Sequence, residues 1–485
     1  MTDLISPPAR RSSQLPTGRT RRRVADLLAL PVLLAGTALI VVDFFIVNVA
    51  LPSLQTDLHA STTAVEWVIA GYGLTFAALL VAAGRIGDRI GRRRVFTIGV
   101  GLFTAASAGC GLAPNPSTLV IARLAQGCGG AMISATVIAL ISVLYDGPAR
   151  ARAISVYATV MGVAAASGQL LGGLLLRSDL AGLGWRLIFL VNLPIGVAAL
   201  IAAPRCLPES RADRAGRVDV VGLVMMTMGL TALVLPLIDG RSAGWPAWTI
   251  ASLAAAPVLL VGFGLRQRGV VRRGLQPLLD PALLRSRSFT AGLLVQLGFW
   301  SGQASYFLVL ALYLQTGRGL SALESGLVFS ILAAAYLVAS MAAPALQARF
   351  GRATVAAGAA ALATGHLLAI GTTIGGAHPV LLLTPALLLA GAGMGLCIAP
   401  ITTTVLSSLE PAQAGVVSGV LSTVQQVGNA LGVAVVGLVF FGALRPGAAE
   451  AFRDSLVLLA GLLAVVAVAA GVLLPARAAA ADAGG

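Results

Sequence analysis

Long apolar stretches separated by short polar segments dominate this chain. Each stretch has about 18 residues or more, which is the length that an α-helix needs to cross roughly 30 Å of hydrocarbon. Fourteen such stretches can be counted, at 28–52, 63–83, 95–113, 118–143, 153–176, 185–204, 218–238, 248–265, 289–315, 324–344, 354–374, 379–405, 413–443 and 455–475. The pattern therefore predicts an all-α membrane protein with fourteen transmembrane helices.

The composition excludes a soluble protein of several domains. Hydrophobic residues make up 58% of the 485 residues and charged residues only 11%, and the mean hydropathy is +0.92. A soluble globular chain carries about a quarter charged residues, so this chain could not cover a water-exposed surface. Most of it must face lipid or other membrane helices.

The residue types that carry enzyme chemistry are absent or scattered. All 33 basic residues are arginine, which excludes the lysine of an ATP-hydrolysing Walker A loop and a Schiff-base lysine. The four cysteines form no C-x-x-C pair, and the sequence contains no H-E-x-x-H or G-x-S-x-G centre. We therefore expect no enzymatic activity, including that of a membrane-embedded enzyme, and neither a metal nor a cofactor.

The arginines lie in short loops between the apolar stretches. If the N-terminus is cytoplasmic, 26 arginines fall on the cytoplasmic side, six fall outside, and Arg123 lies within a helix. This split follows the positive-inside rule and predicts that both termini are cytoplasmic. A nucleic-acid binder would need a soluble basic face, so the formal net charge of +15 indicates contact with anionic lipid and not with nucleic acid.

An internal repeat divides the chain into two halves. The pattern R-x-G-R at 89–92 recurs 260 positions later at 349–352. The repeat indicates two pseudo-symmetric six-helix bundles, two helices inserted between them, and a binding site where the halves meet. The predicted units are a disordered cytoplasmic tail (1–25), the N-terminal bundle (26–205), a linker (206–217), the inserted helices (218–266), a connector (267–287), the C-terminal bundle (288–476) and a cytoplasmic tail (477–485).

The loop 84–94 after the second predicted helix carries five arginines and a single acid, Asp88. Its glycines allow close helix approach and a tight turn, and Asp88 can pair with an arginine or lie at a helix N-terminus. We interpret the loop as a conformational latch; the alternative is a basic loop that only sets topology. The latch residues are Gly84, Gly87, Asp88, Arg89, Gly91 and Arg92.

Several motifs resemble those of a known family. The loop GRIGDRIGRRR resembles the helix 2–3 loop motif of the major facilitator superfamily. Segments that resemble its fourteen-helix drug:proton antiporter branch are Asp43–Pro52, Glu66–Val68 with Tyr72, Arg123–Gly129, Trp185–Gly196 and Pro277–Phe289. The resemblance implies the major facilitator fold, with alternating access, and export of drugs in exchange for protons.

The fifth predicted helix departs from the antiporter motif of that family. Its motif residues are Gly162, Gly168, Gln169, Gly172 and Gly173, and Gln169 stands where the family has proline. The glycines still permit close helix packing, whereas the loss of proline predicts a straighter helix. The sequence therefore supports antiport less strongly at this helix than elsewhere.

Few ionisable residues lie within the apolar stretches, so each is a functional candidate. Asp43 lies roughly 13 Å and Arg123 roughly 8 Å from the outer ends of their helices, so the two could be partners. The family resemblance implies proton-coupling roles for both; the alternatives are a permanently paired structural ion and an interfacial arginine. Glu66 and Glu324 lie at outer helix ends, where solvation is expected, and Glu66 is a candidate secondary acid.

Amides and aromatic residues recur on the ninth and thirteenth predicted helices. On the ninth they share one helical face at spacing i, i+4, i+7 and i+11. Amides beside aromatic rings suit a large amphipathic ligand, and the alternative is hydrogen bonding between helices. The predicted substrate-cavity residues are Gln296, Trp300, Gln303 and Phe307 on the ninth helix and Gln425, Gln426 and Asn429 on the thirteenth.

Together these features predict a monomeric, multi-pass transporter in the cytoplasmic membrane of a bacterium. We expect it to export small amphipathic compounds, such as drugs, antibiotics or secondary metabolites, in exchange for protons. One alternative is uptake of a metabolite by the same fold. Another is a non-transporting sensor or scaffold, which would not need Asp43 and Arg123 at similar depth.

Overall fold

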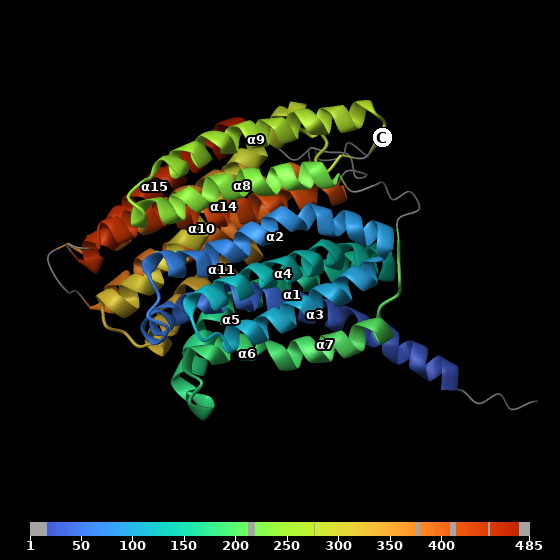
Figure 1. Cartoon of the computed structure of the whole chain (residues 1–485), viewed down its shortest axis with the longest axis horizontal. Helices are drawn as coiled ribbons and strands as arrows, with labels where there is room; N and C mark the ends of the chain where they lie inside the picture. Colours follow the sequence, from blue (N-terminus) through green and yellow to red (C-terminus); the bar gives the residue numbers. More distant parts are fainter. Residues whose placement is uncertain are drawn as a thin grey trace, which may run out of the picture.

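The computed structural model describes residues 17–211, 219–275, 277–374, 379–407, 414–444 and 447–474. Within these ranges every regular element is a helix, and the long helices lie side by side along one axis (Figure 1). Thirteen helices are long and apolar enough to cross a membrane, and α5 (Gly147–Ser178) makes a fourteenth if its two bent parts form one span. The prediction of an all-α, fourteen-helix membrane protein is confirmed.

The N-terminal half contains α1 to α7. The bounds besides those of α5 are α1 Thr17–Asp57, α2 Thr62–Ile90, α3 Arg92–Gly111, α4 Pro116–Leu144, α6 Leu187–Leu190 and α7 Asn192–Cys206. Residues 17–25, predicted to be part of a disordered tail, instead form the start of α1. Arginine favours helix, and the apolar helix that follows supplies the costly nucleus. The rest of that tail, linker residues 212–217, residue 218 and the tail 477–485 lie outside the described residues.

The C-terminal half repeats the arrangement of the N-terminal half. Its helices are α10 Arg287–Leu312, α11 Ala322–Phe350, α12 Arg352–Gly371, α13 Thr384–Ser407, α14 Ala414–Gly442 and α15 Ala448–Leu473. In one half α4 packs against α2 and α3, and in the other α13 packs against α11 and α12. The halves meet through two equivalent pairs, α2 with α14 and α5 with α11. This symmetry supports the predicted six–two–six division; the exact unit boundaries remain a prediction.

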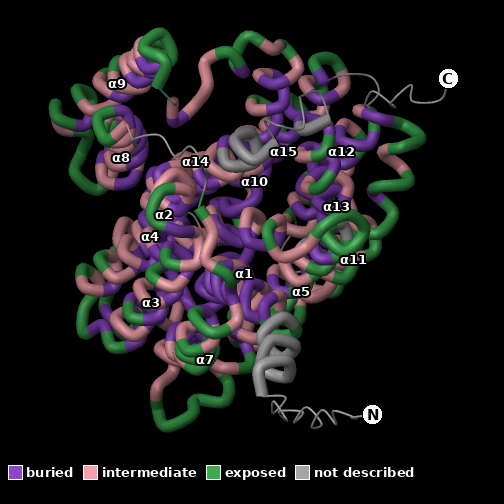
Figure 2. The backbone as a smooth tube through the Cα atoms, turned by 90° about the vertical axis from the view of Figure 1, so that its right-hand side faces the viewer, coloured by how far each residue is buried: buried purple, intermediate pink, exposed green. Residues whose placement is uncertain are grey.

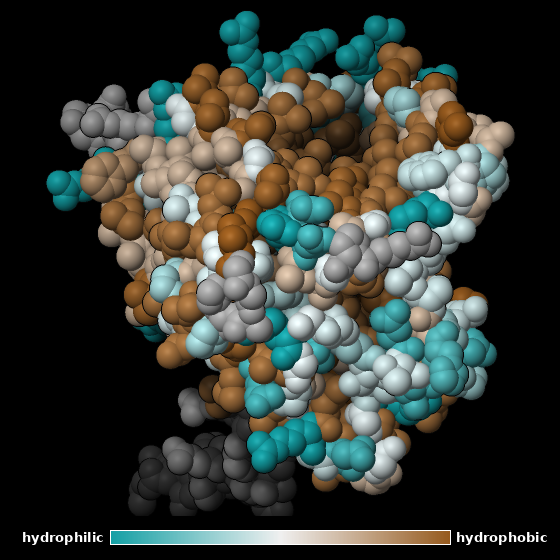
Figure 3. Space-filling model, turned by 90° about the vertical axis from the view of Figure 1, so that its left-hand side faces the viewer, coloured by the Kyte–Doolittle hydropathy of each residue, from teal (hydrophilic) through white to brown (hydrophobic). Residues whose placement is uncertain are grey.

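The two inserted helices form a hairpin at one corner of the bundle. They are α8 (Val220–Ser242) and α9 (Ala247–Arg272), and α8 packs against both α2 and α14 (Figure 2). From Ala247 to Leu265 the exposed side chains of α9 are apolar, among them Val258 at 71% exposure. Figure 3 shows hydrophobic surface lining a hollow at the top of that view, the side on which α8, α9 and α15 lie in Figure 1. Such a surface requires lipid around it.

The expectation of a straighter α5 is wrong. The helix bends by 42° between its parts 147–165 and 167–178. Kinks arise at Ser/Gly pairs as well as at proline, and Ser167 and Gly168 stand at this point. The hydroxyl of Ser167 donates to the Ala164 carbonyl oxygen at 3.3 Å, which draws a backbone acceptor away from the helical pattern.

Close approach between α3 and α4 depends on glycine. A Cβ atom at Gly129 would lie 2.6 Å from the backbone nitrogen of Phe103. We predict that Gly129→Ala lowers the free energy of unfolding by about 1–3 kcal/mol, because the two backbones must separate. Gly264→Ala is the control, since nothing lies within 4 Å of a Cβ there. Thermal unfolding of the purified protein measures both, and equal melting temperatures would contradict this packing.

Candidate functional site

A cavity of about 280 Å³ lies between the two halves. Its wall comes from α1, α2, α4 and α5 of one half and from α10, α11, α13 and α14 of the other. The lining residues lie around the middle of these helices, and on α4, α13 and α14 they extend toward the end that carries the loop 84–94 and the segments 205–211 and 266–273. We call this the arginine-rich end; it is the right-hand end of Figure 1.

The opposite end of the cavity is closed by direct contacts between the halves. Gly173 of α5 packs on α11, where a Cβ atom would lie 2.7 Å from the Ala322 carbonyl oxygen. Gln315 Nε2, in the π-helical turn Tyr313–Gly317 that follows α10, donates to the Val49 carbonyl oxygen of α1 at 2.9 Å. The rings of Phe45 and Phe307 meet edge to face with centroids 5.1 Å apart. The cavity is therefore open toward the arginine-rich end.

A buried ion pair lies directly behind the cavity wall. Arg123 Nη1 of α4 lies 2.5 Å from Asp43 Oδ2 of α1, and the two side chains are only 1% and 0% exposed. The structure thus pairs the two residues that the sequence placed at similar depth. Two full charges can be buried in this way only with excellent geometry and further hydrogen bonds.

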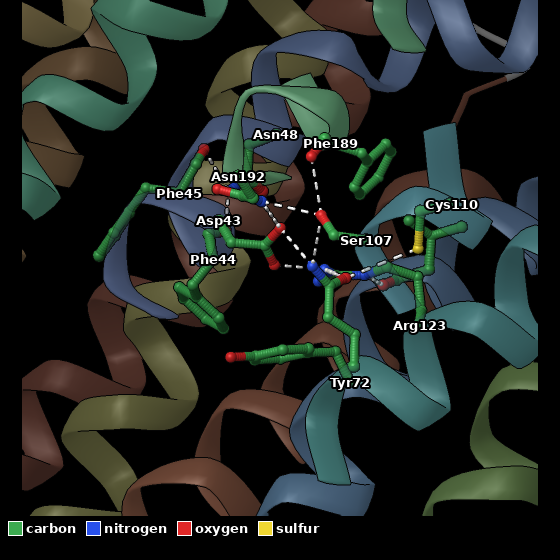
Figure 4. Close-up of polar contacts among 12 residues, drawn as sticks. Asp43, Phe44, Phe45, Asn48, Tyr72, Ser107, Cys110, Arg123, Phe189 and Asn192 are labelled. Carbon is green, nitrogen blue, oxygen red and sulfur yellow. Dashed lines mark hydrogen bonds and ion pairs between the residues drawn. The ribbon is translucent and has the colours of Figure 1, made fainter. Parts of the chain in front are cut away.

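A network of neutral groups supplies those further hydrogen bonds (Figure 4). Gln126 Nε2 and Asn192 Nδ2 donate to Asp43 Oδ1 at 2.7 and 3.0 Å. Both amides also donate to the hydroxyl of Ser107 at 3.3 and 3.1 Å. Arg123 Nε donates to the Val68 carbonyl oxygen at 2.9 Å. The pair is thereby fixed to α1, α2, α3, α4 and α7 at once.

Aromatic rings separate this pair from the cavity. The guanidinium of Arg123 lies over the ring of Tyr72, 4.4 Å from its centroid. Tyr72 and Phe44 both line the cavity, whereas Asp43 and Arg123 do not. A change at the ion pair can therefore reach a bound ligand through the position of the Tyr72 ring.

Glu66 is buried, which contradicts the expected solvation at the end of its helix. The inserted helix α8 covers it, and its side chain is 1% exposed with Arg241 Nη2 3.8 Å away. Arg241 also donates to Thr62 Oγ1 at 3.1 Å and lies over the Phe441 ring of α14. These residues join α2, α8 and α14 on the closed side of the cavity. Glu324 is exposed, as expected, and forms a capping box with Ser321 at the start of α11.

The predicted latch loop is held by an ion pair within the loop and by Glu209, which lies outside it. Asp88 Oδ1 pairs with Arg92 Nη2 at 2.8 Å, and Arg89 is exposed. Glu209, which the sequence did not single out, accepts from the Arg93 backbone nitrogen at 3.2 Å and contacts Gly91, whose φ is +120°. Gly91 is therefore required both for its backbone conformation and for space. Because Glu209 also faces Arg93 and Arg94, Asp88 is not the sole compensating acid of this loop.

Gly87 of the latch and the glycines of the α5 motif lie close to neighbouring helices, whereas Gly84 of the latch does not. Gly87 faces Thr136 of α4, while Gly84 has only Ala135 nearby. On α5, Gly168 and Gly172 pack against Phe45 and Ile46 of α1, and Gly162 faces Tyr336 of α11. Gln169, in place of the motif proline, is 1% exposed and lies in the cavity wall, and neither of its amide atoms has a hydrogen-bond partner among the described residues.

Most of the predicted cavity residues do line the cavity. The wall contains Trp300, Gln303, Phe307, Gln425, Gln426 and Asn429. Gln296 does not line the cavity, because the first half of α10 packs closely against α13 and α14. There Gly292 of α10 contacts Val405 of α13, and Gly428 of α14 contacts Leu297 of α10. The sequence analysis missed the aromatic residues that the N-terminal half contributes, such as Phe45 and Tyr157.

Comparison with known proteins agrees with this architecture. The model of the Major Facilitator Superfamily matches residues 33–433. The chain is 39% identical to a probable actinorhodin transporter of Streptomyces coelicolor over 88% of this chain and 74% of that protein. It is 35% identical to the puromycin resistance protein of Streptomyces alboniger, over 93% of this chain and 92% of that protein. A tetracenomycin C resistance and export protein of Streptomyces glaucescens is 34% identical over 84% and 75%.

Solved structures share the fold at low sequence identity. A D-xylose–proton symporter superposes with a TM-score of 0.67 at 16% identity, covering 92% of this chain and 97% of that one. The POT family transporter PepTSo superposes with a TM-score of 0.68, also at 16% identity and over 92% and 97% of the two chains. These likenesses concern the fold alone.

The Glu66–Arg241 contact predicts a role for α8 in closing the outer side. Arg241→Met should leave Glu66 buried without its cation and weaken the closure, raising the outward-open fraction roughly five- to tenfold. Electron spin resonance distances between labels at Thr56 and Thr316 report the separation of the two halves. Arg453→Met is the control, because Arg453 pairs with the exposed Glu450 on its own helix and not across the two halves in the described part of the chain. Unchanged distance distributions in Arg241→Met would refute the role.

Proposed function

The chain belongs to the major facilitator superfamily, and we propose that it exports drugs, antibiotics or secondary metabolites across the bacterial cytoplasmic membrane in exchange for protons. The observation that carries this proposal is the cavity of aromatic and amide side chains directly beside the buried Asp43–Arg123 pair. The relatives named for actinorhodin, puromycin and tetracenomycin C support export of such compounds. In this proposal the protein acts as a monomer and is not an enzyme.

The proposed mechanism is alternating access around the cavity. By the positive-inside rule the arginine-rich end faces the cytoplasm, so the present conformation is open inward. Substrate enters from the cytoplasm or the inner leaflet and binds between the halves. Opening to the outside then requires α5 to part from α11 and α2 from α14 at their outer ends, while the latch loop closes the inner side.

We assign proton coupling to the ion pair of Asp43 and Arg123. Protonation of Asp43 removes one charge of a buried pair, and the hydrogen bonds from Gln126 and Asn192 must then rearrange. The Tyr72 ring lies between the guanidinium and the cavity, so it can transmit that change to the substrate. One proton entering at ~150 mV supplies about 3.5 kcal/mol, enough to concentrate a neutral compound outward by roughly a few hundredfold.

Two other functions compete with export. Uptake of a metabolite would use the same fold, but the wall of large aromatic residues suits bulky amphipathic compounds better than small polar ones. A sensor or scaffold would gain nothing from a charged pair adjacent to a cavity, and burying such a pair is costly. Export therefore explains the cavity and the ion pair together.

Asp43→Asn tests the coupling, because the amide mimics a carboxyl that never releases its proton. We predict loss of uphill export driven by a pH gradient, with substrate binding retained. The measurement is drug efflux against a gradient in everted vesicles at equal protein levels. Asp57→Asn is the matched control, since Asp57 pairs with Arg186 at the surface. Pumping by Asp43→Asn at the wild-type rate would show that another group carries the proton, with Glu66 the next candidate.

Trp300→Ala tests the assignment of the cavity. We predict a change in substrate profile, with affinity for large aromatic compounds falling about two- to tenfold, because an aromatic contact contributes about 0.5–1.5 kcal/mol. The amount of protein in the membrane should stay the same. Trp248→Ala is the control, because Trp248 of α9 is 44% exposed on the hairpin surface. A uniform loss of resistance together with loss of the protein would make Trp300 a packing residue only.

A further inference from the structure

The hairpin helix α9 has one face that the described part of the chain leaves uncovered. Only 17% of the residues in its apolar span are buried, the smallest share among the thirteen spans. Ala256, Phe263 and Gln267 are buried, and α9 packs on α8. The hydrophobic hollow of Figure 3 lies on this side of the molecule. The opposite face of α9 must therefore be covered by something other than this chain.

The uncovered face of α9 changes from apolar to basic along the helix. Its residues follow the spacing i, i+3, i+7, i+10 and i+14, which places them on one helical face. All five are exposed: Val258, Val261, Leu265, Arg268 and Arg272. The three apolar side chains are 71%, 62% and 59% exposed. A third exposed arginine, Arg273, caps the end of the helix.

The length of the apolar part matches one leaflet of a bilayer. Val258 and Arg268 are ten positions apart. At a rise of 1.5 Å per residue this is about 15 Å, half of the roughly 30 Å hydrocarbon thickness. With the arginines at the level of the lipid headgroups, the apolar part reaches the middle of the bilayer. It is thus as long as one lipid acyl chain of the inner leaflet.

The arginines at the end of α9 lack a counter-ion in the protein. Arg266 is neutralised by Asp219, whose Oδ1 accepts from Nε and Nη2 at 2.9 and 2.6 Å. Arg268, Arg272 and Arg273 have no ion pair in the described ranges, and 266–279 contains no acid. Like charges at i and i+4 destabilise a helix, so an external anion between Arg268 and Arg272 would be favourable.

A network of hydrogen bonds holds this end of α9 in place. Gln267 Nε2 donates to Asp219 Oδ2 at 3.0 Å, and Gln267 Oε1 accepts from the Leu278 backbone nitrogen at 2.7 Å. The adjacent carbonyl oxygen of Pro277 accepts from Arg85 Nη2 of α2 at 2.5 Å. The arginines therefore lie on a fixed base, which lowers the entropy lost when a ligand binds.

Charge complementarity decides what covers this face. A second copy of the chain would bring arginines of the same sign against these arginines. A zwitterionic lipid could fill the apolar part but would leave the three positive charges uncompensated. An anionic phospholipid offers both an acyl chain and a phosphate, and arginine binds phosphate in bidentate geometry. Clusters of arginine at the cytoplasmic surface also attract the anionic lipids of the inner leaflet.

We propose that the uncovered face of α9 binds one anionic phospholipid of the inner leaflet. Arg268, Arg272 and Arg273 bind its phosphate, and an acyl chain lies along Val258, Val261 and Leu265. The site is outside the transport cavity and does not depend on the export function. The bound lipid gives a second attachment to a helix that otherwise packs on α8.

Native mass spectrometry of the full-length protein in a nonionic detergent tests the site. The probes are phosphatidylglycerol, which is anionic, and phosphatidylcholine with the same acyl chains. We expect the first phosphatidylglycerol to bind on the order of tenfold more tightly than phosphatidylcholine. Combined replacement of Arg268, Arg272 and Arg273 by glutamine should abolish this preference. Replacement of all three by lysine should retain most of it, because the charge remains.

The matched control removes the same charge from the same side of the membrane. Arg150, Arg152 and Arg211 are exposed and lie on the arginine-rich side, away from the hairpin. Their combined replacement by glutamine should leave the preference for phosphatidylglycerol unchanged. Only variants that elute as a single folded species are compared, and the lysine variant tests the site if the glutamine variant does not fold.

A photoreactive lipid locates the acyl chain. Phosphatidylglycerol with a diazirine in one acyl chain is added to phosphatidylcholine vesicles that contain the protein. We expect the main cross-links within 258–265, and their loss in the glutamine variant of Arg268, Arg272 and Arg273. A dihexanoyl phosphatidylglycerol, whose chains are too short to follow the helix, should bind on the order of tenfold more weakly than the long-chain lipid.

Three results would overturn the inference. The first is equal binding of phosphatidylglycerol and phosphatidylcholine. The second is an equal loss of preference in the two glutamine variants, which would mean that the arginines only attract the membrane surface in general. The third is cross-linking that avoids α9, or equally tight binding of the dihexanoyl lipid. None of these results bears on uphill export, which is measured separately.

Discussion

A charge inside hydrocarbon must find its partner within the protein, and this requirement organises the N-terminal half. Asp43 and Arg123 satisfy each other, but a carboxylate and a guanidinium offer more hydrogen-bonding positions than one ion pair fills. Gln126, Asn192 and the Val68 carbonyl oxygen take the remaining positions described here. Five helices are thereby tied to one ionic centre, and any change in its charge must be felt by all of them.

The C-terminal half contributes a different chemistry to the shared cavity. Its part of the wall consists of amides, hydroxyls and rings on α10, α11, α13 and α14. An ion pair of that half, Glu450 with Arg453, lies at the partly exposed start of α15, away from the cavity wall. In the proposed mechanism the proton is carried by the N-terminal half, whereas both halves contribute ligand-binding groups to the cavity between them. The hairpin α8–α9 adds Arg241 to the closed side, so in the proposed mechanism it belongs to the moving interface as well as to the lipid-facing surface.

The sequence predicted those features that depend on local pattern. Helix number follows from the length of apolar stretches, and the depth of Asp43 and Arg123 follows from helical rise alone. The predictions were wrong for residues whose surroundings come from a distant segment of the chain. Glu66 is buried because α8 covers it, and Glu209 reaches the latch loop from the linker. Gln296 does not line the cavity because α10 packs against α13 and α14 there. Ser107 belongs to no recognisable motif, so its role in the network could not be predicted. The bend of α5 was missed because the prediction considered the loss of proline and not the Ser167–Gly168 pair, which can also bend a helix.

The central claim is that substrate binding and the proton on Asp43 are linked through one buried network. Calorimetric titration of an exported drug that has no titratable group, in buffers of different ionisation enthalpy, measures the protons exchanged with solvent on binding. At a pH that protonates Asp43 in the ligand-free protein, the account predicts proton release from the wild-type protein and no release from Asp43→Asn, with the drug still bound. Proton release of the same size from Asp43→Asn, or none from the wild type, would contradict it.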